Sequence, residues 1–165
     1  MRDEILSGQA TRESKFAVTS GHPPLPEAER IELLAVLAAD RDQNIREKAA
    51  AELLTQPLAN VLAALGRPGA APQLFAYCAA EFPRRPGVAD ALARTLSCPI
   101  EVLRPVVHYL SVSAVRELFE DLDRLSTSEE LVAALAASSV VTTEQRNQLL
   151  DLQRKDLDPV EAFQE

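Results

Sequence analysis

Clusters of proline and glycine interrupt this chain at close intervals, and they constrain its fold more than any other feature. The breakers "GHPPLP", "GRPGAAP" and "PRRPG" each separate segments in which apolar residues recur every three or four positions. Such spacing is typical of amphipathic helices, whereas a half-buried strand needs an alternation that no segment here sustains. The apolar 47% of the chain is mostly Ala and Leu, which are strong helix formers. The sequence therefore predicts an all-α fold.

The segments between the breakers predict about nine short helices joined by tight turns. Thr11 is the expected N-cap of a first helix, and Pro26 begins the next. Ser126, Thr127 and Ser128 are candidate N-caps of a later helix, and Glu130 is placed for a capping box with Thr127. The last helix begins at Thr142 or Thr143. The residues expected to face inward are Ile31, Leu34, Leu37, Ile45, Ala49, Leu53, Leu58, Val61, Leu62, Leu65, Leu74, Phe75, Cys78, Ala79, Phe82, Val88, Ala91, Leu92, Leu96, Ile100, Leu103, Val107, Leu110, Val115, Leu118, Phe119, Leu122, Leu125, Leu149, Leu150 and Leu152.

The distribution of these segments divides the chain into three parts. Residues 1–25 are polar and form an N-terminal arm whose short helix packs on the first repeat. Residues 26–154 form a helical repeat domain, and residues 155–165 form a polar C-terminal tail. A chain of 165 residues is long enough to bury one substantial core. We therefore expect a single domain between two polar ends.

Three helix–turn–helix junctions share one spacing. In each, a leucine near the end of one helix is followed seven positions later by the residue that starts the next helix. Helix pairs of this kind cannot bury their faces alone and must stack on their neighbours. The sequence predicts an α–α superhelix, or solenoid, and the alternative is a compact bundle whose turns are similar by accident. The three pairs are Leu65 and Pro72, Leu92 and Pro99, and Leu135 and Thr142.

The segment "LAADRDQNIREKAAAELL", residues 37–54, resembles the HEAT-repeat signature. Its turn aspartate, aliphatic–arginine pair and spaced Ala and Leu correspond to Asp40, Ile45, Arg46, Ala49 and Leu53. In HEAT repeats the aspartate and the arginine form hydrogen bonds between layers, so the resemblance implies that role for Asp40 and Arg46. The later repeats lack this pair. Over nearly its whole length the chain also resembles a group of bacterial HEAT-like helical proteins for which no activity is established.

Cys98 and His108 are the residues that most suggest chemistry. A thiol at a helix N-terminus can have a lowered pKa and act as a nucleophile. The junction spacing, however, places Cys98 in the turn position held elsewhere by Ala71 and Val141. His108 lies ten residues further on, roughly 15 Å along an α-helix, and it is expected at the boundary of the core. Both residues are therefore interpreted as structural, and no catalytic residue is predicted.

Metal and cofactor binding are not expected. The two cysteines lie twenty residues apart, without a Cys-x-x-Cys or His-x-x-x-His pattern, which falls short of a zinc site. Cys78 is interpreted as a small core residue, and no glycine-rich phosphate loop is present. Arg84 and Arg85 form an exposed basic turn that either aids solubility or contacts an acidic partner. The acids Glu117, Glu120, Asp121 and Asp123 spread around one helix and are interpreted as a solvated face.

The charge of the chain argues against nucleic-acid binding. The net charge is −8 at pH 7, whereas proteins that bind nucleic acid pair Lys and Arg with phosphates. No apolar segment is long enough to span a membrane, and the N-terminus has no apolar signal region. Together with two cysteines interpreted as reduced thiols, these features predict a cytoplasmic protein. No particular oligomeric state is indicated.

The expected function is a non-catalytic interaction or scaffolding module that binds another protein or a peptide. One alternative is a HEAT-like enzyme that acts on nucleic acid, such as a DNA glycosylase, although the acidic charge and the absence of Trp argue against it. Another alternative is a structural segment that associates with copies of itself.

Overall fold

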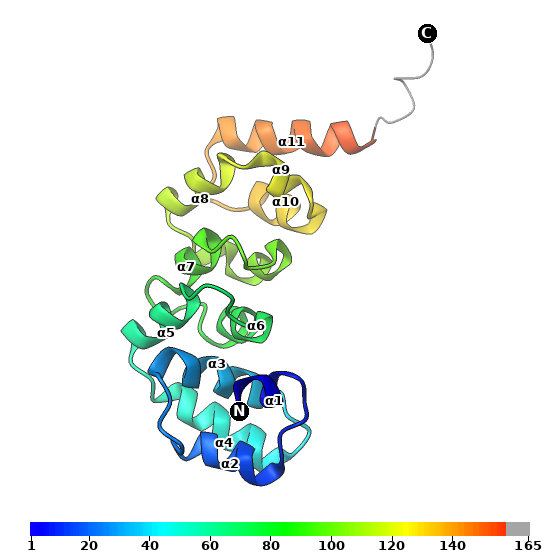
Figure 1. The fold of residues 1–165 in the computed structure, drawn as a ribbon. Helices are drawn as coiled ribbons and strands as arrows, with labels where there is room; N and C mark the ends of the chain where they lie inside the picture. Colours follow the sequence, from blue (N-terminus) through cyan, green and yellow to red (C-terminus); the bar gives the residue numbers. More distant parts are fainter. Residues whose placement is uncertain (158–165) are drawn as a thin grey trace.

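The computed structural model describes residues 1–157, and within them the chain is all-α, with twelve helical segments and no strand (Figure 1). The predicted fold class is therefore correct at this level. Of the polar tail predicted at residues 155–165, residues 158–165 lie outside the described residues. The helices are α1 Arg2–Leu6, α2 Arg12–Thr19, α3 Glu27–Leu37, α4 Gln43–Leu54, α5 Leu58–Leu65, α6 Pro72–Glu81, α7 Val88–Arg94, the 3₁₀-helix η1 Ile100–Tyr109, α8 Val112–Phe119, α9 Leu122–Ser126, α10 Glu129–Ala136 and α11 Thr143–Leu157.

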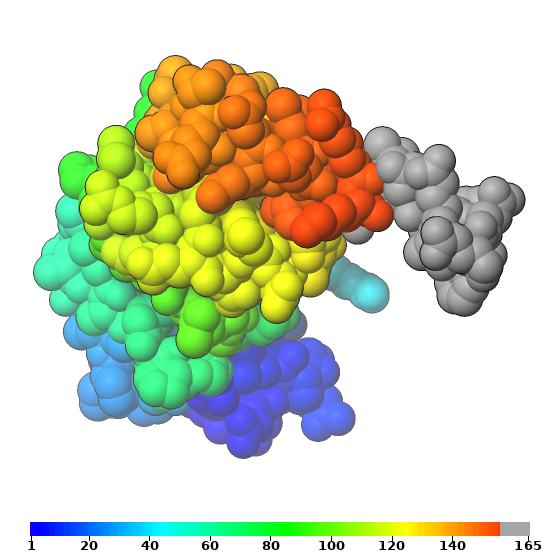
Figure 2. All heavy atoms as spheres, turned by 90° about the horizontal axis from the view of Figure 1, so that it is seen from above, coloured from blue at the N-terminus to red at the C-terminus, as the bar shows by residue number. Residues whose placement is uncertain are grey.

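At the N-terminal end α2 and α4 lie together, with α3 and α1 next to them, and from α5 onward the helices are stacked along one direction in the order of the chain (Figure 1). The helix α3 packs against α1, α2, α4, α5 and α6. Further along, α7 packs on α5, α6 and η1, and η1 in turn packs on α6 and α10. Viewed from the C-terminal end, α11 lies outermost, where it packs on α10 (Figure 2).

One hydrophobic core runs through the whole stack. Most of the residues predicted to face inward are buried, including Ile45, Leu74 and Leu103. The helix α3 is buried on more than one side, because Leu33 and Leu34 are both fully buried although they point to different sides of the helix. A single apolar stripe was expected there, but α3 has five packing partners and is enclosed on nearly all sides.

The three equivalent junctions have the same local burial. Leu65, Leu92 and Leu135 are each 0% exposed. The residue six positions after each leucine is also buried, namely Ala71 at 5%, Cys98 at 2% and Val141 at 5%. The seven-residue spacing therefore marks a turn in which the leucine and the residue six positions after it are both buried in the core.

Two leucines predicted to face inward are exposed. Leu96 is 82% exposed because α7 ends at Arg94 and the extended Thr95 turns the chain outward. Leu150 is 41% exposed because α11 packs mainly on α10, so that only a narrow stripe around Leu149 is covered.

The capping pattern differs from the prediction in two places. Ser128 is the N-cap of α10 and accepts a hydrogen bond from the amide of Leu131, while the Thr127 hydroxyl donates to a carbonyl of the preceding turn. The capping box predicted at Thr127 is therefore wrong. The single helix expected to carry the acids from Glu117 to Asp123 is divided into α8 and α9, because the Asp121 carboxylate accepts from the amide of Arg124 and starts a new helix.

The segment around Pro105 forms a 3₁₀-helix of ten residues rather than a bent α-helix. Proline has no amide hydrogen, and its ring clashes with the carbonyl of the residue four positions earlier, so it disfavours the α-helical pattern. The three-residue period of a 3₁₀-helix places side chains three apart on one face. Ile100, Leu103 and Val106 follow this period and are buried.

The N-terminal arm contains two helices, although only the one after Thr11 was expected. The Thr11 hydroxyl accepts a hydrogen bond from the Ser14 amide, so Thr11 is the N-cap of α2 as predicted. The additional helix α1 buries Ile5 against α3. Arg2 anchors it by donating to the Glu32 carboxylate at 2.6 Å. A contact between residues thirty positions apart leaves no periodic signal in the sequence.

Candidate functional site

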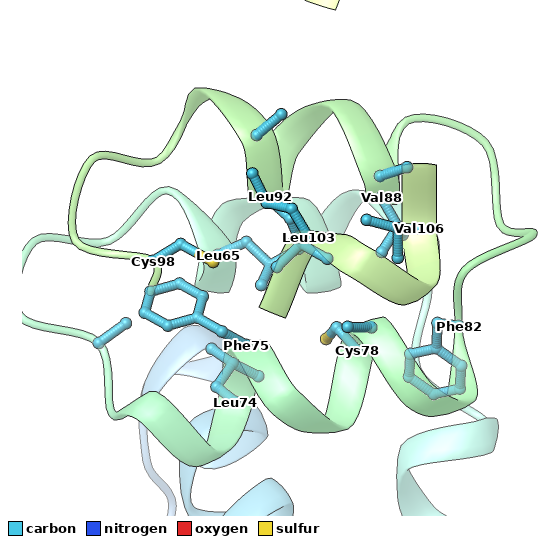
Figure 3. Close-up of a cluster of buried hydrophobic side chains, with 14 of the residues drawn as sticks. Leu65, Leu74, Phe75, Cys78, Phe82, Val88, Leu92, Cys98, Leu103 and Val106 are labelled. Carbon is cyan, nitrogen blue, oxygen red and sulfur yellow. The ribbon is translucent and has the colours of Figure 1, made fainter. Parts of the chain in front are cut away.

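Both cysteines belong to the hydrophobic core formed by α5, α6, α7 and η1 (Figure 3). Cys98 is 2% exposed and Cys78 is 1% exposed. Burial raises the pKa of Cys98 to about 11 and that of Cys78 to about 12. A pKa in this range leaves little thiolate near neutral pH. The environment of Cys98 therefore opposes the activation that its position before a helix suggests.

The structure does not bring a histidine to Cys98. His108 is exposed and lies near the opposite end of η1. A 3₁₀-helix rises about 2 Å per residue, so the two residues are separated by nearly the full length of that helix. The expectation of a boundary position for His108 is wrong, because its side chain faces solvent. His22 is also exposed, in the N-terminal arm.

The acids of α8 and α9 do not converge on one site. Glu117 accepts two hydrogen bonds from Arg94, at 3.0 and 3.2 Å, and these bonds hold its pKa below the usual range. Asp121 caps α9, while Glu120 and Asp123 are exposed or partly exposed. In the described part of the chain, no group of three or more His, Cys, Asp or Glu residues is placed to hold a metal ion.

Asp40 and Arg46 form hydrogen bonds around the turn between α3 and α4. The Asp40 carboxylate accepts from Lys15 on α2 at 2.7 Å and from the Asp42 amide at 2.9 Å. Burial raises the pKa of Asp40, but these hydrogen bonds outweigh it and the net pKa is lowered. Arg46 donates to the backbone carbonyl of Asp40 at 3.1 Å. Asp40 therefore joins two elements, whereas Arg46 bonds within its own turn.

The basic turn at residues 84–85 is partly structural. Arg84 is exposed and donates to the Tyr109 hydroxyl at 3.3 Å. Arg85 is only partly exposed, donates to the carbonyl of Gln56 at 3.0 Å and stacks over the Phe82 ring. Arg85 thus ties the α6–α7 turn to the α4–α5 turn.

The surface has two adjoining hollows that the sequence analysis did not identify. The first, of about 630 Å³, lies between the α5–α6 turn and the α7–η1 turn. The second, of about 210 Å³, lies between the α7–η1 turn and the α8–α9 break. Arg94 and Leu96 line both. We call the first one the arginine hollow, because Arg67 and Arg94 stand on its two walls.

The arginine hollow differs in charge from the chain as a whole. Its lining residues, all of them within the described range, include no Asp or Glu, although the chain carries a net charge of −8. One signal could have predicted it. Arg67 and Arg94 each follow a junction leucine by two positions and are separated by 27 residues, the same distance that separates Leu65 from Leu92.

A third hollow, of about 570 Å³, lies beside α1. It is lined by apolar residues of α1 and α3 together with Lys15, Asp40, Arg41 and Gln73. Lys15 and Asp40 are already paired with each other at 2.7 Å. The lining of this hollow therefore includes a carboxylate, Asp40, whereas the carboxylates paired with Arg67 and Arg94, Glu32 and Glu117, are not among the residues that line the arginine hollow.

No protein-family model, curated protein or solved structure matches this chain. Among residues 1–157, no helix combines the length and the apolar composition needed to cross a membrane. The arginine hollow and the exposed Leu96 beside it are therefore the features that indicate a function.

Proposed function

We propose that this protein is a non-catalytic interaction module, built as a HEAT-like α-solenoid, that binds a peptide segment of another protein. Support for the solenoid comes from the three junctions with equal spacing and equal burial, and from the packing of each helix pair on its neighbours. The hydrogen bond from Lys15 on α2 to Asp40 supports the HEAT-like assignment, whereas Arg46 bonds only within its own turn. Stacked helix pairs commonly present a continuous surface to a partner.

The observation that carries this proposal is Leu96. An isolated exposed leucine needs no explanation, but Leu96 is 82% exposed and stands between two hollows that it helps to line. The hollows follow three successive turns or breaks along the stack, at residues 66–71, 95–99 and 120–121. An apolar side chain flanked by concave surface on both sides is the arrangement expected of an anchor for an elongated partner.

The turn that carries Leu96 is held in place from two sides. Arg124 on α9 donates to the carbonyls of Ala93, Thr95 and Cys98, at 3.1 to 3.3 Å. The Thr95 hydroxyl lies 3.5 Å from the Leu65 carbonyl of the preceding layer. A surface fixed in this way loses little conformational entropy on binding, which favours recognition of a partner over simple solvation of a loose turn.

Charge favours a protein partner over a nucleic acid. A phosphate backbone would have to approach a molecule with a net charge of −8, and it would gain few compensating Lys or Arg contacts. A short peptide carries far less charge and can engage one local patch. Binding between copies of this chain is the competing use of the same surface.

Selection from a random peptide library displayed on phage tests the proposal. We expect peptides that bind the purified protein saturably and in a one-to-one ratio, and that do not bind an unrelated acidic helical protein. Light scattering over a range of concentrations tests self-association directly. A protein that enriches no peptide would contradict the proposed function, and so would one that forms a stable oligomer with the Leu96 surface buried.

A further inference from the structure

We propose that the arginine hollow is the binding site and that its occupant is an extended peptide segment with acidic side chains flanking an apolar one. The carboxylates would bind Arg67 and Arg94, and the apolar side chain would pack on Leu96. This inference rests on the proposed function and deepens it by naming the site and the chemistry of the partner.

The walls of the hollow provide both kinds of contact. Arg67 stands on the α5–α6 turn with 35% of its side chain exposed, and Arg94 stands at the end of α7 with 45% exposed. Between them lies an apolar surface. The volume of about 630 Å³ is within the range of pockets that bury several side-chain-sized groups. The apolar surface is formed by Leu62, Pro68, Ala91 and Leu96.

Arg67 is only weakly paired. The carboxylate nearest to it, Glu32, is 1% exposed and already accepts from Arg2 at 2.6 Å, while Arg67 lies 3.5 Å from its second oxygen. Arg2 also pairs with Asp3 at 3.8 Å, so the cluster as a whole is balanced in charge, but Arg67 itself has a single long contact with an acid. A guanidinium has five N–H donors, so Arg67 can accept an additional anionic partner from the solvent side.

Arg94 is paired with Glu117, but the pair is open to solvent on both sides. Its side chains are 45% and 46% exposed, and ion pairs that are open to solvent contribute little to stability because water screens them. The two bonds to Glu117 use the Nε donor, and one terminal nitrogen lies 3.3 Å from the Ser113 hydroxyl. A carboxylate from a partner can therefore bind Arg94 without removing an interaction that the fold depends on.

The separation of the two arginines sets the spacing of the peptide. They belong to successive helix layers, and packed helices lie about 8–10 Å apart. An extended chain rises about 3.3 Å per residue. Because alternate side chains of an extended chain share a face, two carboxylates four residues apart and an apolar side chain midway between them would all face the protein. The carboxylates, about 13 Å apart along the chain, would reach both arginines through their long, flexible side chains. The apolar side chain would meet the surface around Leu96.

The test uses peptides selected on the wild-type protein and compares two matched pairs of variants by fluorescence polarisation. Arg94→Gln and its control Arg104→Gln each remove a cation from an exposed ion pair between layers; Arg104 pairs with Glu130 at 2.8 Å, outside the hollow. Leu96→Ser and its control Leu54→Ser each remove an exposed leucine, since Leu54 is 70% exposed. Thermal unfolding of all four variants verifies that they are folded.

We expect the selected peptides to share acidic residues four positions apart with an apolar residue midway between them. Arg94→Gln and Leu96→Ser should each weaken binding about tenfold, and both controls should bind as the wild type does. Binding should also weaken as salt is added, because ionic screening reduces attraction between partly exposed charges.

The outcomes separate this inference from the proposed function. Peptides that bind all four variants equally, or whose shared residues are basic, would overturn the arginine hollow as the site while leaving a peptide-binding module in place. A library from which the wild-type protein enriches nothing would overturn both.

Discussion

Leu96 and Cys98 are two residues apart in the same turn, yet their environments are opposite. Leu96 is 82% exposed between two hollows, and Cys98 is 2% exposed in the core. The buried side of the turn is shared with the other two junctions, where Ala71 and Val141 take the place of Cys98. The outer side differs between junctions, because only the first two carry an arginine, at Arg67 and Arg94.

The difference separates residues that hold the fold from residues left free for a partner. The inner position accepts Ala, Cys or Val, so packing rather than chemistry decides what stands there. The outer position combines cations with an exposed apolar side chain that no helix covers. The chemical reactivity of a side chain such as Cys98 therefore indicates function less well here than whether the turn places the side chain in the core or on the surface.

The largest expected effect is the contrast between leucines on the two sides of this turn. Leu92→Ala should lower the free energy of unfolding by about 2–5 kcal/mol, because it leaves a cavity at a fully buried site. Leu96→Ala should change it by no more than about 0.5 kcal/mol. Urea denaturation followed by circular dichroism measures both. Equal losses for the two variants would mean that Leu96 is covered in solution.

A second contrast concerns acids on the inside and the outside of the stack. Glu32→Gln removes the buried charge between Arg2 and Arg67 and should lower the free energy of unfolding by about 2 kcal/mol. The loss should be smaller than for a fully buried ion pair, because both arginines are about a third exposed. Glu130→Gln, with its carboxylate 73% exposed, should cost at most about 1 kcal/mol. The same denaturation experiment decides, and a neutral Glu32→Gln would show that α1 is not anchored by this carboxylate.

The cysteines should also behave as residues of the inner side. Burial raises the pKa of Cys98 to about 11 and that of Cys78 to about 12, above the value of about 8.5 for a free thiol. Their contribution to stability is therefore complete below about pH 8.5 and is lost as the pH rises toward 11–12.

Two readouts test this behaviour. The midpoint of urea unfolding should fall with rising pH across that window, and less so in Cys78→Ala. A thiol reagent at pH 8 should modify the folded protein slowly and the unfolded protein rapidly. Fast modification of Cys98 in the folded state would restore it as a candidate nucleophile.

The repeating turn could be predicted from the sequence because its two fixed points are local. A leucine and a helix start seven positions apart, as at Leu92 and Pro99, gave Cys98 the same turn position as Ala71 and Val141, and all three residues are buried. The 3₁₀ form of η1 was only partly predictable. Pro105 disfavours an α-helix in this segment, but the choice of a three-residue period depends on how the segment packs against α6, α7 and α10.

The candidate site was not predictable in the same way. Leu96 continued the apolar stripe of α7 in sequence, but that helix ends two residues earlier and the turn directs the side chain outward. The arginine hollow exists only because successive turns lie side by side in space. The equal spacing of Arg67 and Arg94 is visible in the sequence, but it acquires meaning only once the layers are stacked.

The most direct test of the division between an inner and an outer side is the affinity of Leu96→Ser and Cys98→Ala for one peptide selected on the wild-type protein. We expect Leu96→Ser to retain its stability and to bind the peptide about tenfold more weakly. We expect Cys98→Ala to be less stable and to bind the peptide with unchanged affinity. Loss of binding in Cys98→Ala together with unchanged binding in Leu96→Ser would contradict this division.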